Sequence, residues 1–179
     1  IGGYGTASGR WLLPTILELD GNFSIPWLIG VLALIGLALT ACFTVSLLRI
    51  RSPLCCIVTA GLLVSFPTVA APFSYMFTSD AYFLSLALAA FGAYAAVRFR
   101  SWPGVALGAV AVAASMGIYQ SYFGVAAVLM VGALIFETLD GQRSFRELVW
   151  TGIQRVCALG GGMALYMLMV KWTTRDIPL

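Results

Sequence analysis

Long apolar runs separated by short groups of polar and charged residues make up most of the chain. The clearest run, residues 26–48, holds no charged residue. At about 1.5 Å per residue it is long enough to cross a hydrocarbon core of about 30 Å. Before it, residues 1–25 are mixed and Gly-rich, which indicates an outer loop with a short interfacial helix. We predict an all-α, polytopic transmembrane helix bundle with one domain over residues 1–179.

The number of spans depends on residues 104–136, a run without charge that is interrupted at Tyr119, Gln120 and Ser121. As a single helix this run would be about 50 Å long, more than a modest tilt accommodates. A break at the three polar residues gives two short spans instead. The expected spans are then six: 26–48, 54–73, 81–97, 104–118, 122–136 and 156–172. Residues 137–155 form a charged segment with amphipathic character before the last of them.

The placement of arginine favours six spans over five. Short cytoplasmic loops are enriched in Lys and Arg. With six spans and the first loop outside, the cytoplasmic loops hold most of the arginines: Arg49, Arg51, Arg98, Arg100, Arg143, Arg146 and Arg155. With five spans the last three move outside and the bias is lost. The six-span arrangement also gathers the notable polar residues on the extracytoplasmic side: Arg10, Glu18, Asp20, Asp80, Tyr119, Gln120 and Asp176.

Composition agrees with a membrane protein and removes several kinds of chemistry. Apolar residues make up 61% of the chain and charged residues 9%, with a net charge of +3 and no His. Without His there is no Ser-His-Asp triad and no imidazole metal site. The basic residues form no continuous patch, so we expect no nucleic-acid partner. The four cysteines lack CxxC spacing and are expected to be small apolar helix residues rather than metal ligands.

Two groups of the outer side could carry chemistry or serve only structure. Asp80 begins the span 81–97; it could cap that helix and complement its dipole, or act as an acid or base at the membrane face of a cavity. Arg10 offers a planar fork suited to phosphate oxygens, and Trp11 beside it suits a sugar or lipid face. An ordinary interfacial anchor pair is the alternative for these two residues.

Weaker signals lie nearby. Glu18 and Asp20 could hold a divalent cation, although one carboxylate pair without further ligands is little evidence. Tyr119 and Gln120 could bind substrate or cap the backbone groups freed at two helix ends. An enzyme on this side has no access to ATP or nucleotide sugars, and lipid-linked sugars would meet its need for an activated substrate.

Three segments together resemble the type II glucosyltransferase family, multi-pass enzymes that modify O-antigen. They are Gly9-Arg10-Trp11, SYMFTSDAYFLSLALAAFGAY over 74–94 and SMGIYQSYFGVAAVL over 115–129. The resemblance implies a GT-C-like architecture in the bacterial inner (plasma) membrane with a periplasmic active site. It implies a polyprenyl-phosphate sugar donor, undecaprenyl-phosphate glucose, and a glycan acceptor. No cofactor is required by the sequence, while a divalent cation is possible.

Carried over to this chain, the resemblance places Arg10 on the donor phosphate and makes Asp80 a catalytic residue near the sugars. Trp11, Tyr75, Tyr119 and Gln120 would bind substrate. The family is expected to carry an acidic pair ahead of Gly-Arg-Trp, but no carboxylate stands among the nine residues from Ile1 to Gly9. The chain starts without Met, so we expect an internal piece of a longer protein, inactive alone, whose principal catalytic acid lies upstream.

Two other classes of protein remain open from the residues alone. Short spans, a helix break and a membrane-facing Asp also occur in transporters or flippases of lipid-linked sugars. The gathering of polar residues on one face, with no charge near the middle of a span, weighs against that class. A non-catalytic membrane assembly subunit would suit the small-residue helix faces.

Overall fold

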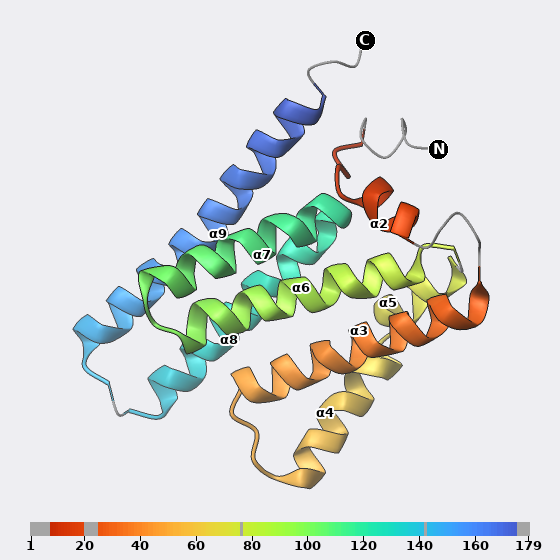
Figure 1. Ribbon diagram of the computed structural model, residues 1–179. Helices are drawn as coiled ribbons and strands as arrows, with labels where there is room; N and C mark the ends of the chain where they lie inside the picture. The colour runs from red at the N-terminus through yellow and green to blue at the C-terminus, as the bar shows by residue number, and fades with distance from the viewer. Residues whose placement is uncertain (1–7, 20–24, 76, 142, 175–179) are drawn as a thin grey trace.

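The computed structural model describes residues 8–19, 25–75, 77–141 and 143–174, and within these ranges the protein is entirely helical, with no strand (Figure 1). The all-α prediction is therefore confirmed. In chain order the elements are α2 (Leu13–Leu19), α3 (Pro26–Leu47), α4 (Pro53–Ser65), α5 (Pro67–Ala70), the 3-10 helix η1 (Ala71–Ser74), α6 (Ser79–Arg98), α7 (Trp102–Ile118), the 3-10 helix η2 (Gln120–Tyr122), α8 (Phe123–Leu139) and α9 (Phe145–Thr173).

The centre of the bundle is α6, which packs against α3, α7 and α8 (Figure 1). Small residues allow this close packing, because a Cβ added at Gly92 would lie 3.0 Å from the Gly108 carbonyl oxygen and one at Gly108 would lie 2.9 Å from that of Gly92. Such contacts bring the backbones of α6 and α7 together. Gly104 of α7 also lies close to α6, because a Cβ there would lie 3.2 Å from the Ala95 carbonyl oxygen.

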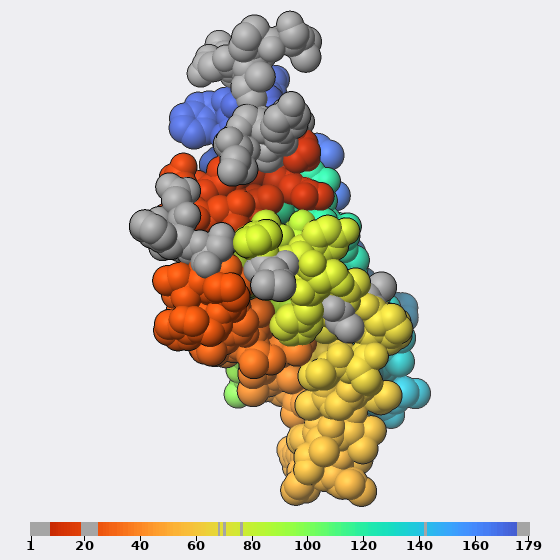
Figure 2. All heavy atoms as spheres, turned by 90° about the vertical axis from the view of Figure 1, so that its right-hand side faces the viewer, coloured from red at the N-terminus to blue at the C-terminus, as the bar shows by residue number. Residues whose placement is uncertain are grey.

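The predicted span 54–73 is not one helix. It is divided into α4, α5 and η1, and the break falls at Phe66, whose backbone is extended because Pro67 follows it. No residue of α4 is buried, and Figure 2 shows this helix (orange to yellow) projecting at the lower end of the molecule. Its apolar side chains are thus available to lipid.

Four helical stretches are long and apolar enough to cross a membrane: Pro26–Leu47, Ser79–Arg98, Gln120–Leu139 and Phe145–Thr173. The helices Pro53–Ser65 and Trp102–Ile118 are apolar but shorter. These findings support four of the six predicted spans, whereas spanning by the two shorter helices stays a prediction.

The polar interruption at Tyr119 separates two helices, as the sequence indicates. Helix α7 ends at Ile118, Tyr119 is extended with φ −149° and ψ 108°, and η2 leads into α8. By contrast, α9 runs unbroken from residue 145 of the charged segment through the last predicted span. Its N-cap is Ser144, whose hydroxyl accepts a hydrogen bond from the Glu147 backbone N–H at 3.4 Å. Ser and Glu at this spacing favour a helix start.

The helices alternate in direction, so the turns between them gather at two ends of the bundle (Figure 1). We call one the arginine end; it holds Arg49, Arg98, Arg100, Glu137, Asp140, Arg143 and Arg155. The other we call the tyrosine end; it holds Arg10, Tyr75, Asp80, Tyr82, Tyr119, Gln120, Tyr122 and Tyr166. Contacts across loops far apart in sequence hold each end together.

Candidate functional site at the tyrosine end

The guanidinium of Arg10 lies over the ring of Tyr119, with its central carbon 5.0 Å from the ring centroid. Two further tyrosines, Tyr82 of α6 and Tyr122 of η2, meet the Tyr119 ring edge-on at centroid distances of 4.9 and 5.2 Å. Tyr75 extends the row by an edge contact of 6.4 Å with Tyr82. The site therefore combines one fixed positive charge with a row of aromatic rings.

The position of Arg10 is set by the residues on both sides of it. Gly9 has φ +78°, a left-handed conformation that glycine adopts without steric cost. On the other side, the Leu12 N–H donates to the Gly117 carbonyl at 2.9 Å, and a Cβ at Gly117 would lie 2.7 Å from the Trp11 ring. The indole of Trp11 thus packs on the last turn of α7, which fixes the loop that carries Arg10.

Gln120 connects the loop before α2 to the last helix. Its Nε2 donates to the Ser8 carbonyl at 2.9 Å and to the Tyr166 hydroxyl at 2.5 Å. The side chain therefore bridges two distant segments, and no side-chain cap hydrogen bond forms at η2 or at α8. Both hydrogen bonds of Gln120 therefore join segments distant in the sequence.

Tyr166 belongs to this site although sequence reasoning did not single it out. It is 9% exposed in the middle of an apolar stretch of α9, where its aromatic ring resembles an ordinary core residue. Its role is shown by the hydrogen bond from Gln120, which lies 46 positions earlier in the chain. No local sequence pattern contains such a contact. The same contact explains Gly9, because a Cβ there would lie 2.6 Å from the Tyr166 hydroxyl oxygen.

Asp80 lies in the first turn of α6 and is 6% exposed. The residue after it, Ala81, packs with Leu13 of α2 and Ile118 of α7, which puts the carboxylate at the junction of three helices. The N-cap of α6 is Thr78, and its side chain makes no cap hydrogen bond. A carboxylate in a first turn is stabilised by the positive end of the helix dipole.

Other predicted residues lie at the edge of this arrangement or outside it. Tyr75 is 65% exposed and joins the row only through Tyr82. Glu18 is exposed on α2, while Asp20 and Asp176 lie outside the described residues. Within the described ranges, no three His, Cys, Asp or Glu side chains cluster as metal ligands.

The Arg10 guanidinium is suited to bind the anionic group of a ligand, and the aromatic ring beside it is suited to contact a ring of the same ligand. The stacking orients the planar fork, whose N–H donors match the oxygens of a phosphate. In the row of rings Tyr75 is exposed, while Tyr82, Tyr119 and Tyr122 are half-buried. The site therefore offers a cation beside aromatic rings.

Comparison with known protein families gives a match over nearly the whole chain. The family described as Glucosyl transferase GtrII matches residues 1–178. No curated protein and no solved structure gave a significant match. With almost every residue included in the family match, the chain belongs to the GtrII glucosyl transferases.

Proposed function

We propose that this protein transfers glucose from a polyprenyl-phosphate sugar to a cell-surface glycan such as O-antigen, as a GT-C-type enzyme. The reaction would take place on the extracytoplasmic face of the bacterial inner membrane, which the tyrosine end would face. The observation that carries the proposal is the Arg10 guanidinium seated on the Tyr119 ring at the tyrosine end. Family membership supports transfer rather than transport or a purely structural role.

The proposed step forms one bond and breaks one. An acceptor hydroxyl oxygen attacks the anomeric carbon of the donor sugar, and the bond from that carbon to the phosphate oxygen breaks. The electron pair stays on the departing polyprenyl phosphate, and a carboxylate takes the hydroxyl proton. A positioned base and a cation on the leaving phosphate each lower the barrier.

In this scheme Arg10 binds the donor phosphate and stabilises its growing negative charge. Asp80 serves as a carboxylate beside the sugars. The ring of Tyr119 holds Arg10 in place, while Gln120 fixes the loop on Tyr166. Trp11 and Tyr75 extend the aromatic surface on which substrate would lie. A divalent cation bound by carboxylates of the full site is compatible with this scheme.

The experiment introduces Arg10→Ala, Asp80→Asn or Gln120→Ala into the full-length protein and measures glucose transfer from labelled polyprenyl-phosphate glucose in membranes. We expect Arg10→Ala and Asp80→Asn to lose transfer by about a hundredfold or more. Arg51→Ala is the matched control, because Arg51 is an exposed arginine at the opposite end. Normal transfer by both the Arg10 and Asp80 variants would overturn the assignment.

A further inference from the structure

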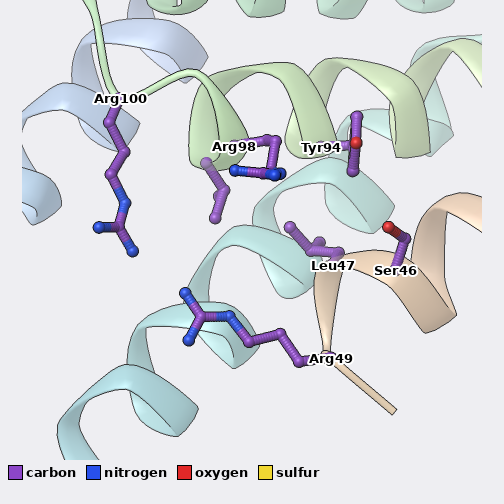
Figure 3. A pocket seen from close by; sticks show the side chains of 7 residues that line it. Ser46, Leu47, Arg49, Tyr94, Arg98 and Arg100 are labelled. Carbon is purple, nitrogen blue, oxygen red and sulfur yellow. The ribbon is translucent and has the colours of Figure 1, made fainter. Parts of the chain in front are cut away.

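Three arginines from two helix ends surround a small pocket at the arginine end (Figure 3). Arg49 follows α3, Arg98 is the last residue of α6, and Arg100 follows α6. The side chains of Arg49 and Arg100 extend toward the space beside Arg98 (Figure 3), and the hydroxyl-bearing residues Ser46 and Tyr94 also line the pocket. Its volume of about 40 Å³ holds about three water-sized groups, which suits the oxygens of one phosphate and is small for a sugar or nucleotide.

Two of these arginines have an unfavourable backbone conformation. Arg49 has φ 55° and Arg100 has φ 43°, each in the left-handed position just after a helix C-cap. Glycine is the usual residue there, and Gly141 occupies the equivalent position after α8 with φ 63°. Arg49 and Arg100 therefore stand at positions where a side chain has a steric cost. Backbone strain of this kind occurs at ligand-binding positions.

Nearby carboxylates do not balance the charge. Asp140 is 3.8 Å from Arg49, and more than half of each side chain is exposed, so the pair is weak. A second acid, Glu137, is shared by three arginines: Arg155 at 2.6 Å, Arg143 at 3.2 Å and Arg100 at 3.5 Å. Arg98 forms no salt bridge with any residue in the described part of the chain. An anion in the pocket would relieve the repulsion among the guanidinium groups.

The surroundings indicate where such an anion would come from. Trp102, at the start of α7, and Trp150 of α9 are 55% and 50% exposed, and their rings meet edge-on at 6.2 Å. Exposed tryptophans at the ends of apolar helices are typical of the headgroup region of a membrane. Basic pockets between helix ends at this depth bind the headgroups of anionic lipids.

We propose that Arg49, Arg98 and Arg100 form a binding site for the phosphate of an anionic phospholipid headgroup, in the leaflet at the arginine end. The site is separate from glucosyl transfer, which is assigned to the tyrosine end. It requires only that the helices cross a membrane. A bound lipid would join the ends of α3 and α6, two helices that pack against each other.

The experiment measures binding of phosphatidylglycerol to the purified full-length protein by native mass spectrometry, with phosphatidylcholine and inorganic phosphate as separate probes. We expect phosphatidylglycerol to be retained in preference to phosphatidylcholine. Arg98→Gln should weaken this retention by about fivefold, the effect of one basic group near an anionic headgroup. Arg51→Gln is the matched control and should leave it unchanged.

A second variant separates loss of the ligand from loss of the fold. Arg49→Gly removes a charge and also the steric cost of the left-handed backbone, so the lipid-free protein should unfold at an equal or higher temperature while phosphatidylglycerol retention falls. Equal weakening by Arg51→Gln would overturn the site in favour of diffuse attraction. Displacement of phosphatidylglycerol by inorganic phosphate at equal concentration would also overturn the lipid assignment. Retention of phosphatidylcholine to the same extent as phosphatidylglycerol would overturn it as well.

Discussion

Ser85 and Ser115 exchange hydrogen bonds across the interface between α6 and α7. The Ser85 hydroxyl donates to the Ser115 carbonyl at 2.9 Å, and the Ser115 hydroxyl donates to the Ser85 carbonyl at 2.8 Å. Both residues are fully buried. The pair fixes the register of the two helices in the half of the bundle that carries the candidate site, because Ile118 ends α7 one turn later.

The first prediction concerns this pair. Replacing Ser85 with Ala removes its hydrogen bond to the Ser115 carbonyl and its 3.2 Å contact with the Ser115 hydroxyl. This should lower the free energy of unfolding by about 0.6–1 kcal/mol, the usual value between membrane helices. Denaturant unfolding in detergent would measure it. Thr138→Ala is the control, because Thr138 is exposed and bonds only the Leu134 carbonyl of its own helix. Equal losses from the two substitutions would contradict a role for the exchange.

The second prediction concerns Glu137 at the arginine end. Glu137 and Arg155 are almost fully buried and 2.6 Å apart, and the other terminal nitrogen of Arg155 donates to the Met130 carbonyl at 3.1 Å. Glu137→Gln leaves the buried guanidinium without a counter-charge, which should cost about 3–5 kcal/mol of unfolding free energy.

Two further variants test the cause of that loss. The double substitution Glu137→Gln with Arg155→Gln should recover part of the stability, since no buried charge then lacks a partner. Asp140→Asn should change stability by less than about 1 kcal/mol, because Asp140 and Arg49 are an exposed pair at 3.8 Å. A double variant less stable than Glu137→Gln alone would contradict the explanation.

The third prediction concerns Gly9. An alanine there must adopt φ +78° and place its Cβ 2.6 Å from the Tyr166 hydroxyl and 2.8 Å from Gln120 Nε2. The loop should shift and Arg10 with it, so we expect glucose transfer in membranes to fall by about tenfold to a hundredfold. Gly160→Ala is the control, because nothing lies within 4 Å of a Cβ at that position. Unchanged transfer by Gly9→Ala would show that the loop position is not needed.

The fourth prediction separates the ring of Tyr119 from its hydroxyl. Phenylalanine keeps an aromatic face under Arg10, whereas alanine removes it. We expect Tyr119→Phe to retain transfer within about threefold and Tyr119→Ala to lose about tenfold or more. If the two variants lost transfer equally, the loss would be due to the missing hydroxyl. The ring would then not be the support for Arg10.

The helical class and the break at Tyr119 could be predicted because both depend on local pattern. An uncharged run long enough to cross a bilayer, and polar residues that interrupt one too long, leave few alternatives. The division of residues 54–73 was missed, although Pro67 carried the signal: proline pushes the residue before it out of helical conformation. The continuous α9 was also missed, since a charged segment followed by an apolar one suggests two elements.

The candidate site could be predicted only in part, for a different physical reason. Arg10, Tyr119 and Gln120 were identified as polar groups on one side, but their contacts depend on packing between segments distant in the sequence. Tyr166 shows the limit, because its hydroxyl is a partner of Gln120 only once α9 lies beside the end of α7. The left-handed arginines are likewise visible only in the backbone angles.

One property of α9 has a consequence for the two ends of the molecule. The helix is uninterrupted from Phe145 to Thr173 and carries both Arg155 and Tyr166, about 16 Å apart along its axis at 1.5 Å per residue. Both side chains belong to one continuous helix. A rotation of α9 that separated Arg155 from Glu137 would also withdraw the Tyr166 hydroxyl from Gln120, so a change in the ion pair at the arginine end would reach the loop that carries Arg10.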